Sequence, residues 1–236
     1  MSRPPGDRLT ARRIVRRFGG VTAVDEADLV VPAGRITALT GPNGAGKSTL
    51  FDCLSGAQRP DSGRILLSGR DITRLPEHDR ARLGLARTFQ QIAVFPRLTV
   101  GENVRIGAEQ AGRRAPAEAA RATGRTLALL GLAGLRDRPA AALPGGVLRL
   151  VELGRALAAD PGVLLLDEPA AGLDRAETER LALLLRALAG NGLAVLLVEH
   201  DRELVDRIAD TVYTMDRGRT GAVRATAVGG GRSGAA

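Results

Sequence analysis

The pattern of apolar and polar positions divides the chain into three parts. Short apolar runs separated by glycine-rich turns come first, and they predict strands at 12–17, 27–31, 35–40 and 64–67. Alanine, leucine and arginine at helical spacing replace this alternation between about residues 100 and 160. Continuous apolar runs then return at 163–167 and 193–198, as expected for parallel strands that are covered on both faces.

Polar residues that can cap a helix predict two helices in the C-terminal part of the chain. Asp174 and Glu177 form an Asp-x-x-Glu variant of a capping box, and it opens a helix with a leucine-rich side. A second helix is expected near Asp201. Strands that alternate with helices predict an α/β fold with a mostly parallel sheet.

Composition and charge narrow the classes of protein. The 236 residues are 44% hydrophobic and 25% charged, which fits a globular chain, and the length fits one sizeable domain or two small ones. The net charge is +8, but the arginines are interleaved with acids and aromatic residues make up only 2%, so we expect no nucleic-acid partner. The only cysteine, Cys53, is expected in the core, and His78 in a charged segment is expected in solvent. No run reaches membrane-spanning length and no signal peptide is evident, so we expect neither export by that route nor insertion.

A phosphate-binding loop is the clearest chemical motif. Gly41 to Ser48 reads Gly-Pro-Asn-Gly-Ala-Gly-Lys-Ser and fits G-x-x-x-x-G-K-[ST] between an apolar strand and a helix. The glycines let backbone N–H groups turn toward phosphate oxygens, and the helix N-terminus adds partial positive charge. Lys47, the only lysine, would neutralise the β- and γ-phosphates, and the Ser48 hydroxyl would ligate Mg²⁺. The motif indicates a nucleoside triphosphate.

Acidic and imidazole groups follow two of the later strands. Asp167 and Glu168 end the apolar run at 163–167, at the edge where open α/β sheets bind ligands. One carboxylate would hold Mg²⁺ and the other would polarise a water in line with the γ-phosphate. His200 follows the run at 193–198, and its position after the other motifs makes it a further catalytic candidate.

With these motifs in order, the chain resembles an ATP-binding-cassette (ABC) transporter ATPase from about residue 8 to 220, most closely the ATPase subunits of branched-chain amino acid importers. The segments that carry this resemblance are Phe18-Gly19-Gly20-Val21, Ala86-Arg87-Thr88-Phe89-Gln90, Leu98-Thr99-Val100-Gly101-Glu102-Asn103-Val104, Glu168-Pro169-Ala170-Ala171-Gly172-Leu173 and Glu199-His200-Asp201. The resemblance implies a P-loop NTPase of ABC type, with a mostly parallel sheet flanked by helices, an N-terminal antiparallel β subdomain and an α-helical subdomain. It places one domain at 1–221, with the core and β subdomain at about 8–91 and 156–221, the helical subdomain at about 92–155, and a flexible tail at 222–236.

The resemblance also assigns residues. ATP and Mg²⁺ would be held by the loop residues Gly41, Pro42, Asn43, Gly44, Ala45, Gly46, Lys47, Ser48 and Thr49. Gln90 would touch Mg²⁺ or the attacking water, beside the metal ligands Ser48 and Asp167. Phe18 would stack on adenine, against a core role as the alternative. Asp174 would lie at a dimer seam, although helix capping competes with that role.

One motif departs from the family. The signature, usually Leu-Ser-Gly-Gly-Gln, reads Leu143-Pro144-Gly145-Gly146-Val147 here. In the family, this segment of one ATPase subunit completes the ATP site of the other. Pro144 supplies neither a hydroxyl nor an N–H and Val147 supplies no amide, whereas Gly145 and Gly146 still let backbone approach the phosphate. The sequence leaves both a homodimer and a heterodimer open. With a partner subunit that supplies an intact signature, we expect two unequal sites in the working dimer.

The implied function is an ATP-hydrolysing subunit that drives uptake of branched-chain or similar amino acids. Its partners would be membrane permease subunits, a second ATPase subunit and, indirectly, a periplasmic or extracellular solute-binding protein, with this chain peripheral on the cytoplasmic face of the membrane. A nucleotide-dependent switch with little hydrolysis is the alternative that the degenerate signature motivates. An ABC-type ATPase of DNA repair or translation is disfavoured, because the chain has neither a long coiled-coil insertion nor a second cassette.

Overall fold

Two β-sheets form the frame of the molecule, and the computed structural model describes them within residues 6–88, 93–110 and 115–225. The first sheet is antiparallel, with strand order β2-β1-β4-β5. Its strands are β1 (Asp7–Phe18), β2 (Val21–Pro32), β4 (Ser62–Leu67) and β5 (Arg70–Asp71). It is the antiparallel β subdomain that the resemblance implies.

The second sheet has the order β10-β9-β3-β8-β7-β6, and all its pairs are parallel except β9 with β10. Its strands are β3 (Ile36–Thr40), β6 (Leu85–Arg87), β7 (Val163–Asp167), β8 (Ala194–Val198), β9 (Thr211–Asp216) and β10 (Arg219–Ala225). The expected mostly parallel α/β sheet is confirmed. The apolar run at 163–167 matches β7 residue for residue.

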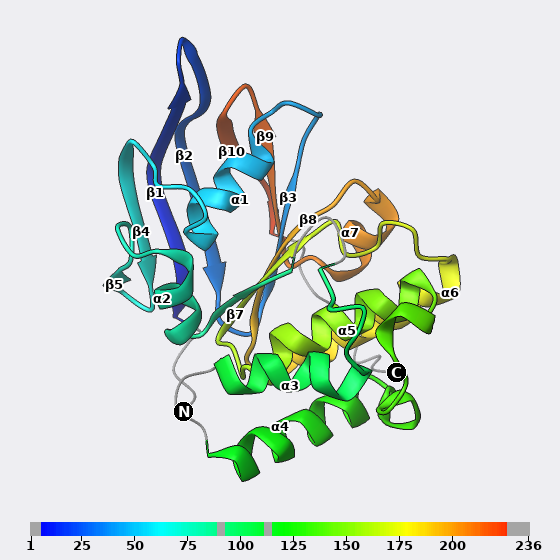
Figure 1. Cartoon of the computed structure of the whole chain (residues 1–236). Helices are drawn as coiled ribbons and strands as arrows, with labels where there is room; N and C mark the ends of the chain where they lie inside the picture. The colour runs from blue at the N-terminus through cyan, green and yellow to red at the C-terminus, as the bar shows by residue number, and fades with distance from the viewer. Residues whose placement is uncertain (1–5, 89–92, 111–114, 226–236) are drawn as a thin grey trace, which may run out of the picture.

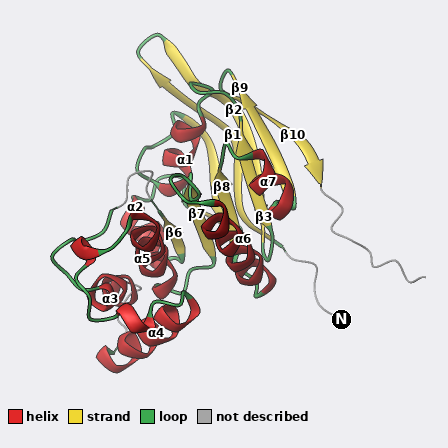
Figure 2. Cartoon of the chain, turned by 90° about the vertical axis from the view of Figure 1, so that its right-hand side faces the viewer, coloured by secondary structure: helices red, strands yellow, loops and turns green. Residues whose placement is uncertain are grey.

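Helices cover both faces of the second sheet (Figures 1 and 2). They are α1 (Lys47–Ser55), α2 (Glu77–Arg82), α3 (Val100–Gln110), α4 (Pro116–Leu129), α5 (Gly145–Ala158), α6 (Arg175–Gly190) and α7 (Arg202–Ile208). Side chains of β7 alternate between two cores: Leu165 packs with α1 and the antiparallel sheet, whereas Leu164 and Leu166 pack with α5 and α6. This two-sided burial explains why β7 and β8 read as continuous apolar runs.

Two elements end slightly past the domain bounds that the resemblance implies, and the division into subdomains stays a prediction. The helical subdomain is expected to end at about residue 155, and α5 ends at Ala158. The flexible tail was expected from residue 222, but β10 continues to Ala225 because it pairs with β9 along that length. Among the described helices, none combines the length and the apolar character that a membrane crossing requires.

The expected helix starts are confirmed. The Asp174 side chain accepts from the Glu177 backbone N–H at 2.8 Å, and the Glu177 side chain accepts from the Asp174 N–H at 3.0 Å, so the capping box of α6 is complete. Asp201 caps α7 by accepting from the Leu204 N–H. Cys53 is buried in α1, and burial raises the pKa of its thiol to about 11.

The charged segment around His78 contains one buried residue. His78 is exposed as expected, but Arg80 of the same helix is only 1% exposed. Its guanidinium donates to the carbonyl oxygens of Cys53 at 2.7 Å and Leu54 at 2.8 Å, at the C-terminal end of α1. It also donates to the carbonyls of Leu75 and Thr73. Arg80 therefore joins α2 to the free carbonyls of the helix that follows the phosphate loop.

Replacing Arg80 with methionine is expected to destabilise the fold by about 3 kcal/mol or more, because it leaves several buried carbonyls without their charged donor. Urea unfolding of the purified chain measures this change. Arg82→Met is the matched control, since the Arg82 side chain is mostly exposed and pairs with Asp79 on the surface, and we expect it to cost no more than about 0.5 kcal/mol. Equal midpoints for the two variants would contradict the role assigned to Arg80.

Candidate nucleotide-binding site

The phosphate loop connects the end of β3 to the first residue of α1, as the sequence predicts. Its backbone passes close to two other strands. A Cβ at Gly41 would lie 2.2 Å from the carbonyl oxygen of Met215, and one at Gly46 would lie 2.1 Å from that of Ala23. Both glycines also have positive φ, 146° and 103°. Glycine is therefore required at both ends of the loop by conformation and by space.

Lys47 is held inside this loop. Its Nζ donates to the carbonyl oxygens of Gly41 at 2.8 Å and Pro42 at 2.9 Å, and the side chain is 6% exposed. Burial lowers the pKa of the ammonium, whereas the nearby carboxylates of Glu168 and Asp167 raise it. The loop thus positions its one ammonium group beside the two acids before any phosphate is bound.

A cavity of about 640 Å³ brings the predicted groups together. Its lining comes from β2, the loop, the start of α1 and the ends of β7 and β8: Ala23, Asn43, Gly44, Gly46, Lys47, Ser48, Thr49, Glu168, Val198 and His200. The volume is within the usual range for ligand sites. Segments more than 100 residues apart in sequence therefore meet at the carboxyl ends of neighbouring parallel strands.

Glu168 and His200 form a pair in this cavity. The His200 Nε2 lies 3.2 Å from the Glu168 Oε1. Glu168 has φ of 48°, a left-handed conformation that side chains other than glycine seldom adopt. The backbone thus turns sharply at the end of β7, and the two side chains predicted to act in catalysis are in contact.

Asp167 lies deeper, beside a basic residue that the sequence analysis did not assign a role. Burial raises the pKa of the Asp167 carboxyl, and the Arg87 guanidinium, 4.0 Å away, opposes that rise. Arg87 also forms an ion pair of 2.8 Å with Asp52 and donates to the Ser55 hydroxyl. It therefore connects the strand-end acid to α1. The sequence showed only a basic residue in the segment Ala86 to Gln90, without its distant partners.

The side-chain oxygens of Ser48 and Asp167 suit a hard cation such as Mg²⁺. Ser48 is the second residue of α1 and Asp167 is the last residue of β7, and their side chains supply oxygen ligands of the kind that Mg²⁺ prefers. Gln90, the third predicted metal contact, lies outside the described residues. Within the described ranges, no cluster of three or more His, Cys, Asp or Glu residues forms a separate metal site. Phosphate oxygens usually complete the coordination of Mg²⁺ at nucleotide sites, and Ser48 and Asp167 would supply the protein ligands here.

Phe18 lies at the end of β1, where the β1–β2 hairpin turns. Its ring is 44% exposed, and the Arg16 guanidinium lies 4.6 Å from the ring centroid. The alternative of a core phenylalanine is therefore wrong. Ala23 on the next strand of the hairpin lines the phosphate cavity, so the hairpin that presents Phe18 also borders that cavity. Stacking on adenine stays a prediction for this ring.

The signature segment begins α5. Pro144 is the N-cap residue and provides no side-chain cap, and Gly145 and Gly146 form the first turn. Gly146 lies against the Glu177 carboxylate, because a Cβ there would approach Glu177 Oε1 to 2.4 Å. Val147 packs against the core beneath the helix. Asp174 caps α6, as described above, and a role for it at a dimer seam stays a prediction.

Comparison with known proteins agrees with this geometry. The ABC transporter family matches residues 24–171. The high-affinity branched-chain amino acid transport ATP-binding protein LivG of Escherichia coli (strain K12) is 37% identical over 225 residues, which is 89% of this chain and 88% of LivG. A relative at this identity and coverage shows the family of the chain.

Solved structures show the same fold. A nucleotide-free ATP-binding cassette from an ABC transporter has a TM-score of 0.86 and 31% identity, covering 93% of this chain and 92% of that one. A cassette in its ADP conformation has a TM-score of 0.83 and 32% identity, covering 91% and 89%. The chain therefore belongs to the ABC transporter family, as one of its ATP-binding and ATP-hydrolysing cassettes.

Proposed function

We propose that this cassette powers import of branched-chain or similar amino acids through separate membrane permease subunits. The Glu168–His200 contact at 3.2 Å, in the cavity of the phosphate loop, is the observation that supports ATP hydrolysis at this site. The solute class is supported by LivG, whose name describes high-affinity branched-chain amino acid transport. The chain would lie peripherally on the cytoplasmic face of the membrane and serve a solute-binding protein on the other side.

The residues divide the chemistry of phosphoryl transfer between them. Loop N–H groups and Lys47 would hold the β- and γ-phosphates and offset the charge that develops between them. Mg²⁺, which neutralises phosphate charge when bound, would be held by Ser48, Asp167 and Gln90. Glu168 would orient and polarise the attacking water. His200, which follows the neighbouring strand β8, would hold Glu168 in place and contact the γ-phosphate. Phe18 would stack on the adenine ring.

Two such cassettes would close on two ATP molecules, each completed by the partner's signature helix. The first N–H groups of α5, at Gly145 and Gly146, and the helix dipole would face the partner's γ-phosphate. Pro144 offers no hydroxyl there. Val147 packs into its own core, which accounts for an apolar residue where the family usually has an amide. The site that this helix completes would be the weaker of the two.

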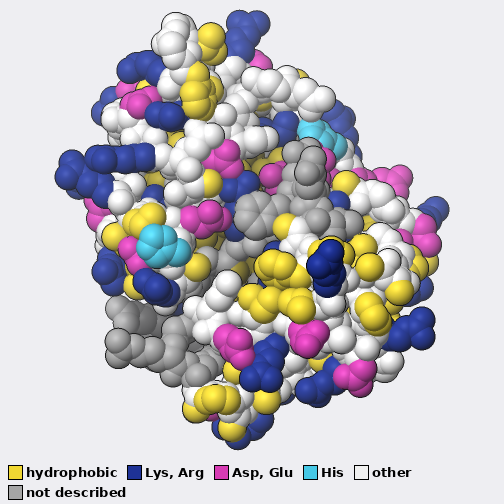
Figure 3. Space-filling view, in the orientation of Figure 1, with side chains coloured by type: hydrophobic (Ala, Val, Ile, Leu, Met, Phe, Trp, Pro, Cys, Tyr) yellow, Lys and Arg dark blue, Asp and Glu magenta, His cyan; other side chains and the backbone are white. Residues whose placement is uncertain are grey.

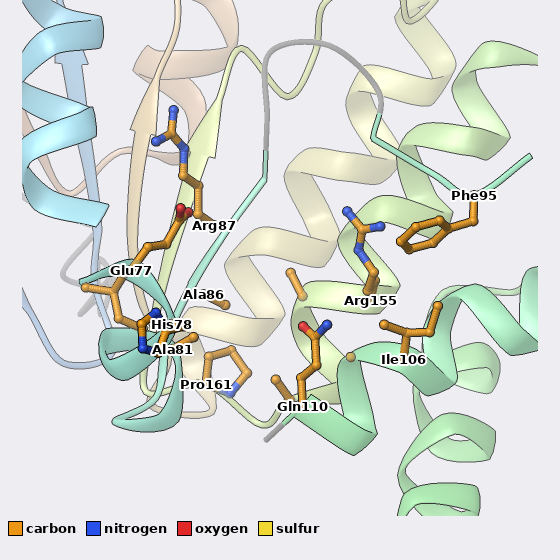
Figure 4. A pocket seen from close by; sticks show the side chains of 14 residues that line it. Glu77, His78, Ala81, Ala86, Arg87, Phe95, Ile106, Gln110, Arg155 and Pro161 are labelled. Atoms are coloured by element: carbon orange, nitrogen blue, oxygen red, sulfur yellow. The ribbon is translucent and has the colours of Figure 1, made fainter. Parts of the chain in front are cut away.

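A second groove offers a surface for the permease (Figure 4). It has a volume of about 480 Å³ and lies between α2, β6, α3 and α5. Figure 4 shows Phe95 beside Arg155 on one side and Glu77 with His78 on the other. Phe95 is 46% exposed and the Arg155 guanidinium lies 5.5 Å from its ring centroid. Phe95 lines the groove, and we propose that the permease docks on this surface at Phe95 and Arg97.

The charge distribution suits a protein partner better than nucleic acid. In Figure 3, basic side chains are scattered among acidic ones over the described part of this face and do not form a continuous basic patch. Nucleic-acid binders usually gather their lysines and arginines on one surface. A switch without hydrolysis is also not favoured, because a protein that only binds nucleotide has no need of the paired Glu168 and His200.

Glu168→Gln in the assembled transporter is expected to lower both ATP turnover and leucine uptake by at least about 100-fold, because the attacking water loses its base. Phosphate release and uptake of radiolabelled leucine into proteoliposomes measure the two losses. Glu179→Gln, on the exposed side of α6, is the matched control and should retain both activities. Unchanged phosphate release in Glu168→Gln would support the switch instead, and ATP turnover without leucine uptake in the parent would contradict the solute.

Restoring the signature is expected to speed the weaker site. The variant Pro144→Ser with Val147→Gln would regain a hydroxyl contact with phosphate, and such a charge-assisted bond is worth about 1.5 to 3 kcal/mol. ATP turnover of the assembled transporter should then rise by roughly 10-fold or more if that site limits the cycle. A rate equal to that of the parent would show that the departure from the family signature has no effect on hydrolysis.

A further inference from the structure

Glu199 is a buried carboxylate that lies between the loop that carries Glu168 and the loop that carries His200. It follows β8 and directly precedes His200. Only 4% of the residue is exposed. A buried carboxylate is unfavourable unless other groups satisfy its charge, so its surroundings indicate what holds it there.

Backbone N–H groups from two separate loops donate to the Glu199 carboxylate. One oxygen, Oε1, accepts from the N–H of Ala170 at 3.0 Å, in the loop that follows β7 and Glu168. The other oxygen, Oε2, accepts from the N–H of His200 at 2.8 Å and of Asp201 at 3.3 Å. A single side chain therefore ties the loop that carries Glu168 to the loop that carries His200.

Other hydrogen bonds also hold the loop after β7: the Ala171 N–H donates to the Glu168 carbonyl, and the Arg149 guanidinium donates to the Ala171 carbonyl. The Glu168 N–H continues the sheet ladder by donating to the Val198 carbonyl at 2.9 Å. Beyond it the chain turns away through the left-handed conformation of Glu168, φ 48°. Two residues later, the backbone N–H of Ala170 donates to the Glu199 carboxylate. The strained turn is thus fixed on both sides, by the sheet before it and by Glu199 after it.

A purely local role in starting α7 does not account for this arrangement. The side chain of Asp201 already caps that helix by accepting from the Leu204 N–H at 3.1 Å. The Ala170 contact crosses to a loop 29 residues away in sequence, and a helix start does not require it. Glu199 therefore connects the loop after β7 to the loop after β8, and it also accepts hydrogen bonds within the turn after β8.

We propose that Glu199 is a positioning residue for ATP hydrolysis, which holds the His200 and Glu168 loops in register so that their side chains stay in contact. This inference rests on the proposed roles of Glu168 and His200. Glu199 itself does not line the phosphate cavity, so it acts through its two neighbours. Small displacements of positioned catalytic groups cost up to about 100-fold in rate, because the reacting geometry tolerates little error.

Glu199→Gln tests the proposal, since the amide keeps the size of the side chain but replaces one acceptor with a donor that faces N–H groups. In the assembled transporter we expect kcat for ATP to fall by about 10- to 100-fold while KM changes by less than about threefold. Glu203→Gln, an exposed glutamate in the first turn of α7, is the matched control and should keep the parent rate. An unchanged kcat in Glu199→Gln would overturn the proposal.

A double-mutant cycle separates positioning from general damage to the fold. If Glu199 acts through the His200–Glu168 pair, adding Glu199→Gln to His200→Ala should lower kcat by no more than about twofold beyond His200→Ala alone. If the kcat losses of the two single variants multiply in the double variant, the proposal is overturned. Full activity of His200→Ala would refute the proposed hydrolytic pair itself, which is a different failure from an unaffected Glu199→Gln beside an impaired His200→Ala.

Glu199→Asp provides a second variant should the glutamine variant not fold. The shorter side chain keeps its charge but does not span both loops, so kcat should again fall while ATP binding to the isolated chain is retained. A fluorescent ATP analogue measures that binding. Parent kcat in Glu199→Asp, or a loss of ATP binding equal to the loss of kcat, would overturn the positioning role.

Discussion

The site depends on the confinement of one ammonium group inside its own loop. Lys47 donates to the carbonyls of Gly41 and Pro42, and the loop turns tightly enough to allow this only because glycines stand where Met215 and Ala23 leave no room for a Cβ. Loop, β2 and β9 are therefore packed as one unit. The ammonium group is thereby held at a defined place in the cavity that the phosphate loop lines.

The remaining groups reach the same point through the topology of the parallel sheet. Neighbouring strands β3, β7 and β8 deliver the loop, the acids and the histidine to one edge. Charged side chains then join the strand ends to the helices: Arg87 connects Asp167 to α1, and Arg80 connects α1 to α2. Because α2 and Arg87 also line the groove proposed for the permease, the docking surface and the phosphate helix are linked by short, buried contacts.

Sequence reasoning succeeded where local chemistry decides the structure. The phosphate loop, the apolar strand β7 and the Asp174–Glu177 capping box follow from residues within a few positions of one another. It also placed Glu168 and His200 at one sheet edge, because the carboxyl ends of parallel strands coincide. Strand β1 is longer than expected: its pairing with β2 continues through charged residues, as it does where one face of a sheet is solvated.

Contacts between distant segments were the part that the sequence did not reveal. Arg80 stands among charged neighbours and reads as solvated, yet it lies in the core because the end of α1 presents free carbonyls to it. Glu199 likewise reads as one more strand-end acid, and its partner Ala170 is 29 residues away. The most direct test of the central claim is titration of the folded chain with a fluorescent ATP analogue and Mg²⁺. Saturable binding should be present in the parent and in Glu168→Gln and lost in Lys47→Ala, whereas unchanged affinity in Lys47→Ala would contradict the account.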